Sequence, residues 1–154
     1  MTAPVGVRPL NPSHLAVGRM LLEGETPAGT ARRLPMFIGT VRRRLTEIGR
    51  RLGAATAVDR AVALLAGGHL PPPSGGMLTP GLRSVDIAVL KVLTKLVPED
   101  TLAEDLRAGD AFLTYLEKLC VRCGARTDAH LVTLAAAWNL LPDLVPHPVP
   151  GEEQ

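Results

Sequence analysis

The chain has 154 residues, of which 46% are apolar, 21% charged and 3% aromatic, and its formal net charge is +2. This apolar fraction can build a hydrophobic core and excludes a wholly disordered chain. The few aromatic residues argue against a large β-sandwich and against stacking platforms for single-stranded nucleic acid. No apolar run reaches the ~18 residues that span a bilayer, and no signal-peptide pattern is present. We therefore expect a helix-rich, cytoplasmic protein without a membrane partner.

Prolines and glycines divide the chain into two segments of similar size, residues 10–70 and residues 82–141, here called the first and second segments. Residues 71–81 carry clustered Pro and Gly and are predicted to form a linker. Residues 1–9 are expected to be a flexible arm, and the proline-rich residues 142–154 a disordered tail without helix.

The first segment begins with signals for two helices. Asn11 is a suitable N-cap for a helix that ends near Gly24. Thr26 is followed by proline, which is the usual order of an N-cap and a first helical residue. This second helix is short, because Leu34 is followed by another proline.

Two further helices follow in the first segment. Apolar residues recur at helical spacing between Gly39 and Leu52, which predicts one buried stripe. Gly53 suits the left-handed position that ends a helix. Thr56 has a capping spacing and leads into the fourth helix, residues 58–65.

The second segment repeats this order at a constant offset of 71 residues. Ser84 is the expected cap of its first helix, and Pro98 opens a short helix that ends near Leu106. An apolar stripe between residues 112 and 123 matches that of residues 41–52, and a Gly-Ala-x-Thr sequence follows both stripes. The fold class predicted is therefore all-α, with two tandem four-helix units.

Residues 26–34 and 39–54 resemble the LuxR-type (GerE-like) helix-turn-helix domain. That family's pattern is a helical Ile-Ala-x-x-Leu, a turn, and Gly-Thr-Val-Lys/Arg-x-His-Leu-x-x-Ile-x-x-Lys/Arg-Leu-Gly. The match is gapless from Leu10 to Gly53, and the second segment resembles the family more weakly. The resemblance implies a recognition helix at residues 39–52 that enters the major groove of duplex DNA.

The resemblance also assigns contacts. Arg42, Arg43 and Thr46 match base-facing positions of the family. Thr40, Arg50 and Arg51 match phosphate-facing positions, and Thr26 matches a backbone contact at a helix start. Since Glu47 lies between two predicted core positions, it is expected to face outward with the arginines. Arg44 is expected to reach a phosphate or an acidic neighbour.

Charge favours the first segment as the DNA-binding one. It holds nine basic and four acidic residues, a net charge of +5, whereas the second holds seven basic and eight acidic residues, a net charge of −1. Phosphate neutralisation drives much of nucleic-acid binding. In the second segment Leu113 and Val121 stand at positions equivalent to Arg42 and Arg50, so this unit is interpreted as degenerate.

The degenerate unit is expected to serve assembly. Leu113 and Val121 would form an exposed apolar face that docks on the first segment, on another subunit or on a partner protein. Trp138 is either an interface anchor or part of the core. In the LuxR-type family the last helix commonly mediates dimerisation, so either the two segments pair within one chain or two chains form a homodimer through the second unit.

No catalytic or cofactor-binding arrangement is recognised, and no enzyme activity or cofactor is expected. The Cys120-x-x-Cys123 pair lacks a second pair, and buried apolar packing explains it better than zinc or redox chemistry. Two functions remain open: a nucleoid-associated transcription regulator that binds double-stranded DNA, and a helix-turn-helix-derived module that binds or sequesters another regulator.

Overall fold

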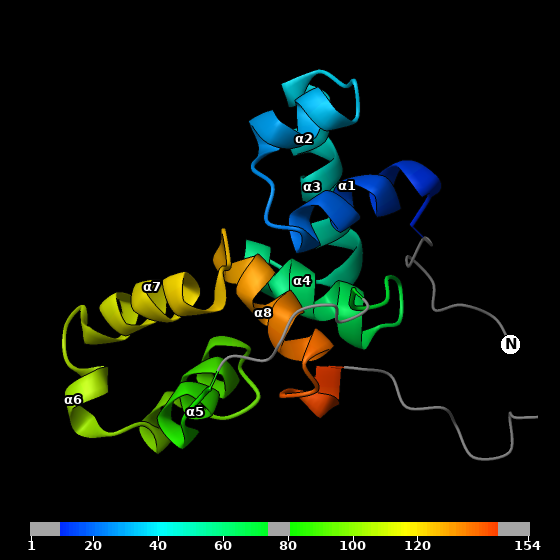
Figure 1. Ribbon diagram of the computed structural model, residues 1–154. Coiled ribbons are helices and arrows are strands. Elements are labelled where there is room, and N and C mark those ends of the chain that lie inside the picture. The colour runs from blue at the N-terminus through cyan, green and yellow to red at the C-terminus, as the bar shows by residue number, and fades with distance from the viewer. Residues whose placement is uncertain (1–9, 74–80, 145–154) are drawn as a thin grey trace, which may run out of the picture.

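A computed structural model describes residues 10–73 and 81–144 of the chain (Figure 1). These residues form eight α-helices and two short 3-10 helices, and no strand occurs among them, so the predicted all-α class is confirmed. The expected arm, most of the linker and residues 145–154 of the tail lie outside this description. Within the described ranges, no helix has the length and apolarity needed to cross a membrane.

The first segment folds as its caps predict. Its four helices are α1 (Pro12–Leu22), α2 (Pro27–Arg33), α3 (Ile38–Leu52) and α4 (Ala57–Ala66). The Asn11 side chain accepts a hydrogen bond from the His14 backbone N–H at 2.9 Å, and the His14 ring accepts one from the Asn11 N–H at 3.2 Å. Thr26 and Thr56 cap α2 and α4 in the same way, each accepting from the backbone three residues on.

The second segment keeps this order with two differences. Its elements are α5 (Ser84–Leu93), η1 (Glu99–Thr101), α6 (Glu104–Arg107), α7 (Ala111–Cys123) and α8 (Asp128–Ala137). The cap of α5 is Arg83 and not Ser84, because the Asp86 carboxylate accepts the Arg83 backbone N–H. The helix expected from Pro98 is interrupted, because Leu102 is extended and its side chain is buried in the core.

Backbone landmarks recur at the spacing of 71 residues. The residue that follows α1 is Gly24, with φ of 82°, and its counterpart after α5 is Lys95, with φ of 62°. Gly53 and Gly124 end α3 and α7 in the left-handed conformation. Gly68 and Asn139 have φ of 72° and 61° after α4 and α8. The offset seen in the sequence therefore also holds for the chain's rarest backbone conformations.

The two segments share one hydrophobic core. Helices α4 and α8 pack against each other at the centre of the molecule, with α1–α3 on one side and α5–α7 on the other (Figure 1). Fully buried leucines of α4, Leu64 and Leu65, belong to the same cluster as Leu131 and Val132 of α8. The pairing of α4 with α8 therefore joins both segments into a single packed body.

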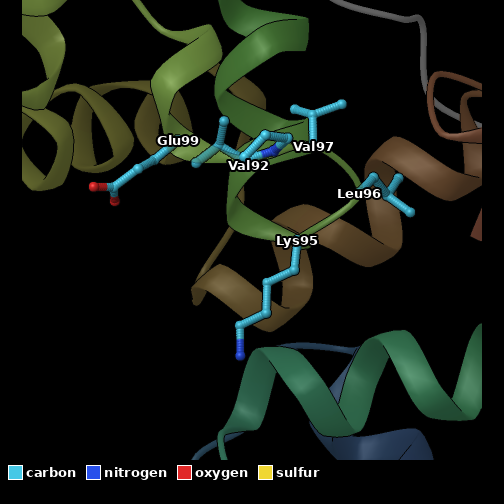
Figure 2. Close-up of a pocket in the computed structure, with 6 residues that line it drawn as sticks. Val92, Lys95, Leu96, Val97 and Glu99 are labelled. Atoms are coloured by element: carbon cyan, nitrogen blue, oxygen red, sulfur yellow. The ribbon is translucent and has the colours of Figure 1, made fainter.

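Contacts across this junction are reciprocal. Gly24, after α1, adjoins His130 of α8, because a Cβ on Gly24 would stand 2.9 Å from the His130 Cβ. Lys95, after α5, extends toward α4 (Figure 2), where its Nζ lies 3.2 Å from an Asp59 carboxylate oxygen. The members of both pairs are related by the offset of 71 residues. Such reciprocity is the property of an isologous, two-fold interface.

The ordered chain extends beyond the expected end of the second segment. Residues Pro142–Leu144 form the 3-10 helix η2, which contacts α4, and Leu144 is fully buried. The expectation of a disordered tail from residue 142 is therefore wrong for these three residues. The reason is that one leucine between prolines finds a place in the shared core, which its local sequence does not reveal.

Candidate functional site

Helix α3 presents a basic face to solvent. Val41 and Ile48 are fully buried and fix the inner side of the helix. The opposite side carries Arg42, Arg43 and Arg50, which are exposed as expected. Arg43 and Arg50 are seven residues apart, so they lie on the same side of the helix two turns from each other.

These three arginines, here called the outer arginines, have no acidic partner in residues 10–73 or 81–144. None of the ion pairs or side-chain hydrogen bonds found there involves their guanidinium groups. An Arg side chain always carries its charge near neutral pH. The outer arginines therefore form a positive surface that the described part of the protein leaves uncompensated.

The other polar side chains of α3 fasten the helix to α1. Arg44 donates to the Ser13 hydroxyl at 3.1 Å and to the Glu47 carboxylate at 2.7 Å. The hydrogen bond from Arg44 lowers the pKa of Glu47, against a smaller opposing effect of burial. Arg51 lies 3.3 Å from the ring of the buried His14. This α1–α3 network includes the acidic neighbour expected for Arg44.

Two residues expected on the outward face are thus placed differently. Glu47 and Arg51 are half-buried, and both contact His14 of α1. Their positions follow from the packing of α1 along α3, which is a tertiary contact. The structure therefore leaves Arg51 outside the set of outer arginines.

The three threonines of the expected site have local partners or partial cover. The Thr46 hydroxyl donates to the backbone carbonyl of Arg42 at 3.0 Å and is exposed at the outward face. Thr26 is exposed and its hydroxyl caps α2 by accepting from Gly29. Thr40 is half-buried in the first turn of α3. Of the three, Thr46 lies closest to the outer arginines in sequence and shares their helix face.

Two exposed apolar residues at the start of α3 were not singled out from the sequence. Phe37 is the N-cap residue, forms no side-chain cap hydrogen bond, and is 86% exposed. Ile38, the first helical residue, is 39% exposed. The signal that could have revealed them is an apolar pair at a position where Ser, Thr, Asp or Asn is usual.

On α7 the corresponding surface is apolar and partly acidic. Leu113 is 57% exposed and Val121 is 80% exposed, as the sequence predicts. Asp105 and Asp110 nearby in the chain are also exposed. Trp138, by contrast, is half-buried and packs against the hydrophobic core, so its ring is largely engaged within the chain.

Helix α7 is held by a buried carboxylate that the sequence analysis missed. Asp86 of α5 is fully buried and accepts hydrogen bonds from the Tyr115 hydroxyl and from Arg122, at 3.1 Å from its Nη2. Burial alone would raise the pKa of Asp86. The hydrogen bonds and the charge of Arg122 outweigh this effect and lower the pKa to about 2.

The two cysteines lie on the inner part of α7. Cys123 is buried, and burial together with the nearby Asp128 carboxylate raises the pKa of Cys120 to about 12. The thiolate, which binds metals and attacks disulfides, is therefore strongly disfavoured at Cys120. Across the described ranges, no three His, Cys, Asp or Glu side chains gather in a way that could hold a metal ion.

Comparison of the chain with models of protein families, with curated proteins and with solved structures finds no match.

Proposed function

We propose that the protein is a transcription regulator that binds double-stranded DNA in a sequence-specific manner, with α3 in the major groove. The observation that carries this proposal is the set of outer arginines, exposed on one face of α3 and without acidic partners in the described residues. An Arg guanidinium can donate two hydrogen bonds to guanine O6 and N7, or one to a phosphate. The resemblance of residues 10–53 to LuxR-type domains agrees with this placement.

The α1–α3 network supports the same function. Because Arg44 and Arg51 hold α3 against α1, the backbone under the outer arginines is fixed before any ligand binds. A fixed helix loses little conformational freedom on binding, which favours affinity. The division of labour among the arginines of α3 therefore fits a rigid reader of a polyanion.

We infer that the second segment organises this reader and does not read DNA itself. Its net charge of −1 and its exposed Leu113 and Val121 disfavour phosphate contacts. The contact of α4 with α8 corresponds to the dimerisation contact that the family resemblance implies, here made within one chain. One molecule would then offer one basic helix, and a single chain would bind a single recognition site.

The proposal is tested by the salt dependence of binding to a duplex obtained by random-site selection. Each phosphate neutralised contributes about 0.9 to the slope of log K against log salt. Replacing Arg42, Arg43 and Arg50 together by Ala should weaken binding and reduce this slope by up to about three. The control is Arg107→Ala, which removes an exposed arginine from α6. Equal slopes for wild type and the triple variant would refute the proposal.

A second function is favoured by one specific observation, the exposure of Leu113 and Val121 on α7. A helix-turn-helix-derived module that binds another regulator would use this apolar surface and would not need the outer arginines. Capture of a partner from the native host should then be lost in Leu113→Asp and retained in the triple arginine variant. The reverse result would rule out this second function.

A further inference from the structure

The start of α3 combines a rigid backbone with a freely exposed aromatic ring. The Phe37 carbonyl accepts hydrogen bonds from the Thr40 and Val41 backbone N–H groups at 2.9 and 3.1 Å, which fixes this residue at the helix entry. Its ring is nevertheless 86% exposed. A ring on a fixed backbone retains only two side-chain torsions, so ordering it against a ligand costs little entropy.

The exposed apolar atoms continue directly into the basic face. Ile38 precedes Arg42 by four residues, so the two side chains are neighbours on the helix surface. The outer arginines thus follow Phe37 and Ile38 along the same helix. The second exposed apolar pair, Leu113 and Val121, differs because acidic Asp105, Asp110 and Glu117 lie near it in the chain and all three are exposed.

This arrangement matches one occupant, the floor of a DNA major groove that contains thymine. The N-terminal residues of a recognition helix contact base edges in the groove. The thymine C5-methyl group is the apolar feature that the major groove presents, and Phe is among the residues that contact it. The positive charge beside Phe37 complements the flanking phosphates, whereas it would oppose burial of the ring against a neutral protein surface.

We propose that Phe37, supported by Ile38, is a specificity-determining residue that contacts a thymine methyl group next to the base pair read by Arg42 or Arg43. This inference rests on the proposed function and adds a base preference to it. Sequences with cytosine in place of that thymine lose the methyl contact. The DNA site of the protein therefore contains an obligatory thymine within the reach of the first turn of α3.

The test removes the methyl group alone. Each thymine of the selected duplex is replaced in turn by deoxyuridine, which keeps the base pair and lacks only the C5-methyl. At one position, wild type should bind about fourfold more weakly, as expected for one buried carbon. Phe37→Ser should bind more weakly than wild type and show no further loss at this position. Serine is a preferred N-cap residue, so this variant should retain the fold, which thermal unfolding checks.

The matched control is Val121→Ser, which removes an equally exposed apolar side chain from α7 and should keep the wild-type response to deoxyuridine. The proposal is overturned if no thymine shows a methyl effect, or if Phe37→Ser retains it. In that case a lower salt slope in the triple arginine variant would leave the proposed function standing. Absence of duplex binding by wild type would refute both. An unchanged methyl effect with altered self-association of Phe37→Ser would identify a protein contact instead.

Discussion

The buried carboxylate of Asp86 should make a large contribution to folding stability. It is fully buried, and Arg122, Tyr115 and the Arg83 backbone all donate to it. Its pKa is about 2 in the folded protein against 3.8 as the ordinary value. At about 1.4 kcal/mol per unit, this difference corresponds to about 2 kcal/mol of stability near neutral pH. Asp86→Asn should therefore destabilise the protein by about 2–3 kcal/mol.

The pH dependence has a definite sign. Because the folded-state pKa lies below the unfolded one, the unfolded chain takes up the proton first as the pH falls. The contribution of Asp86 is therefore complete above about pH 5 and is lost as the pH falls through 4 toward 2, with roughly half gone at pH 3. The difference in stability between wild type and Asp86→Asn should shrink over the same interval.

The assay is urea unfolding at pH 7 and pH 3, followed by circular dichroism and by the fluorescence of Trp138, the single tryptophan. The control is Asp100→Asn, because Asp100 is exposed and none of the observed ion pairs involves it. A difference below about 0.5 kcal/mol at pH 7, within the usual range for surface substitutions, would refute the reasoning. So would an equal difference at both pH values.

Three further predictions concern the core, the junction and the thiols. Leu131→Ala should cost about 2–5 kcal/mol and leave a single unfolding transition by calorimetry, because the leucine lies in a core that both segments share. Gly24→Ala should lower the melting temperature more than Gly53→Ala: both residues have positive φ, but only Gly24 would place its Cβ within 2.9 Å of α8. Cys120 in the native protein should react with a disulfide reagent far more slowly than free cysteine up to pH 9, because its pKa is about 12.

Helix boundaries that depend on local chemistry could be predicted from the sequence. Asn11, Thr26 and Thr56 cap helices because a side-chain oxygen reaches a backbone N–H three residues away. Gly53 ends α3 because its φ of 67° suits glycine best. The cap of α5 was assigned one residue too late, because it is the Asp86 side chain, reaching back, that defines the helix start.

The candidate site was predictable only where it depends on helix periodicity. The outward positions of Arg42, Arg43 and Arg50 follow from the buried stripe of the same helix. The half-buried positions of Glu47 and Arg51 depend on α1, which is remote in sequence, so periodicity could not reveal them. The pairing of α4 with α8 was one of several open alternatives, since burial of a helix face does not identify its partner.

The reciprocal junction between the segments has a consequence for how such a protein can diverge. Two identical subunits that pair must change together, because every substitution appears on both sides of the symmetry axis. Here the two sides are encoded separately, and the covalent connection keeps them together at any dilution. One side can therefore retain a basic helix while its counterpart acquires Leu113 and Val121, and the shared core preserves both shapes.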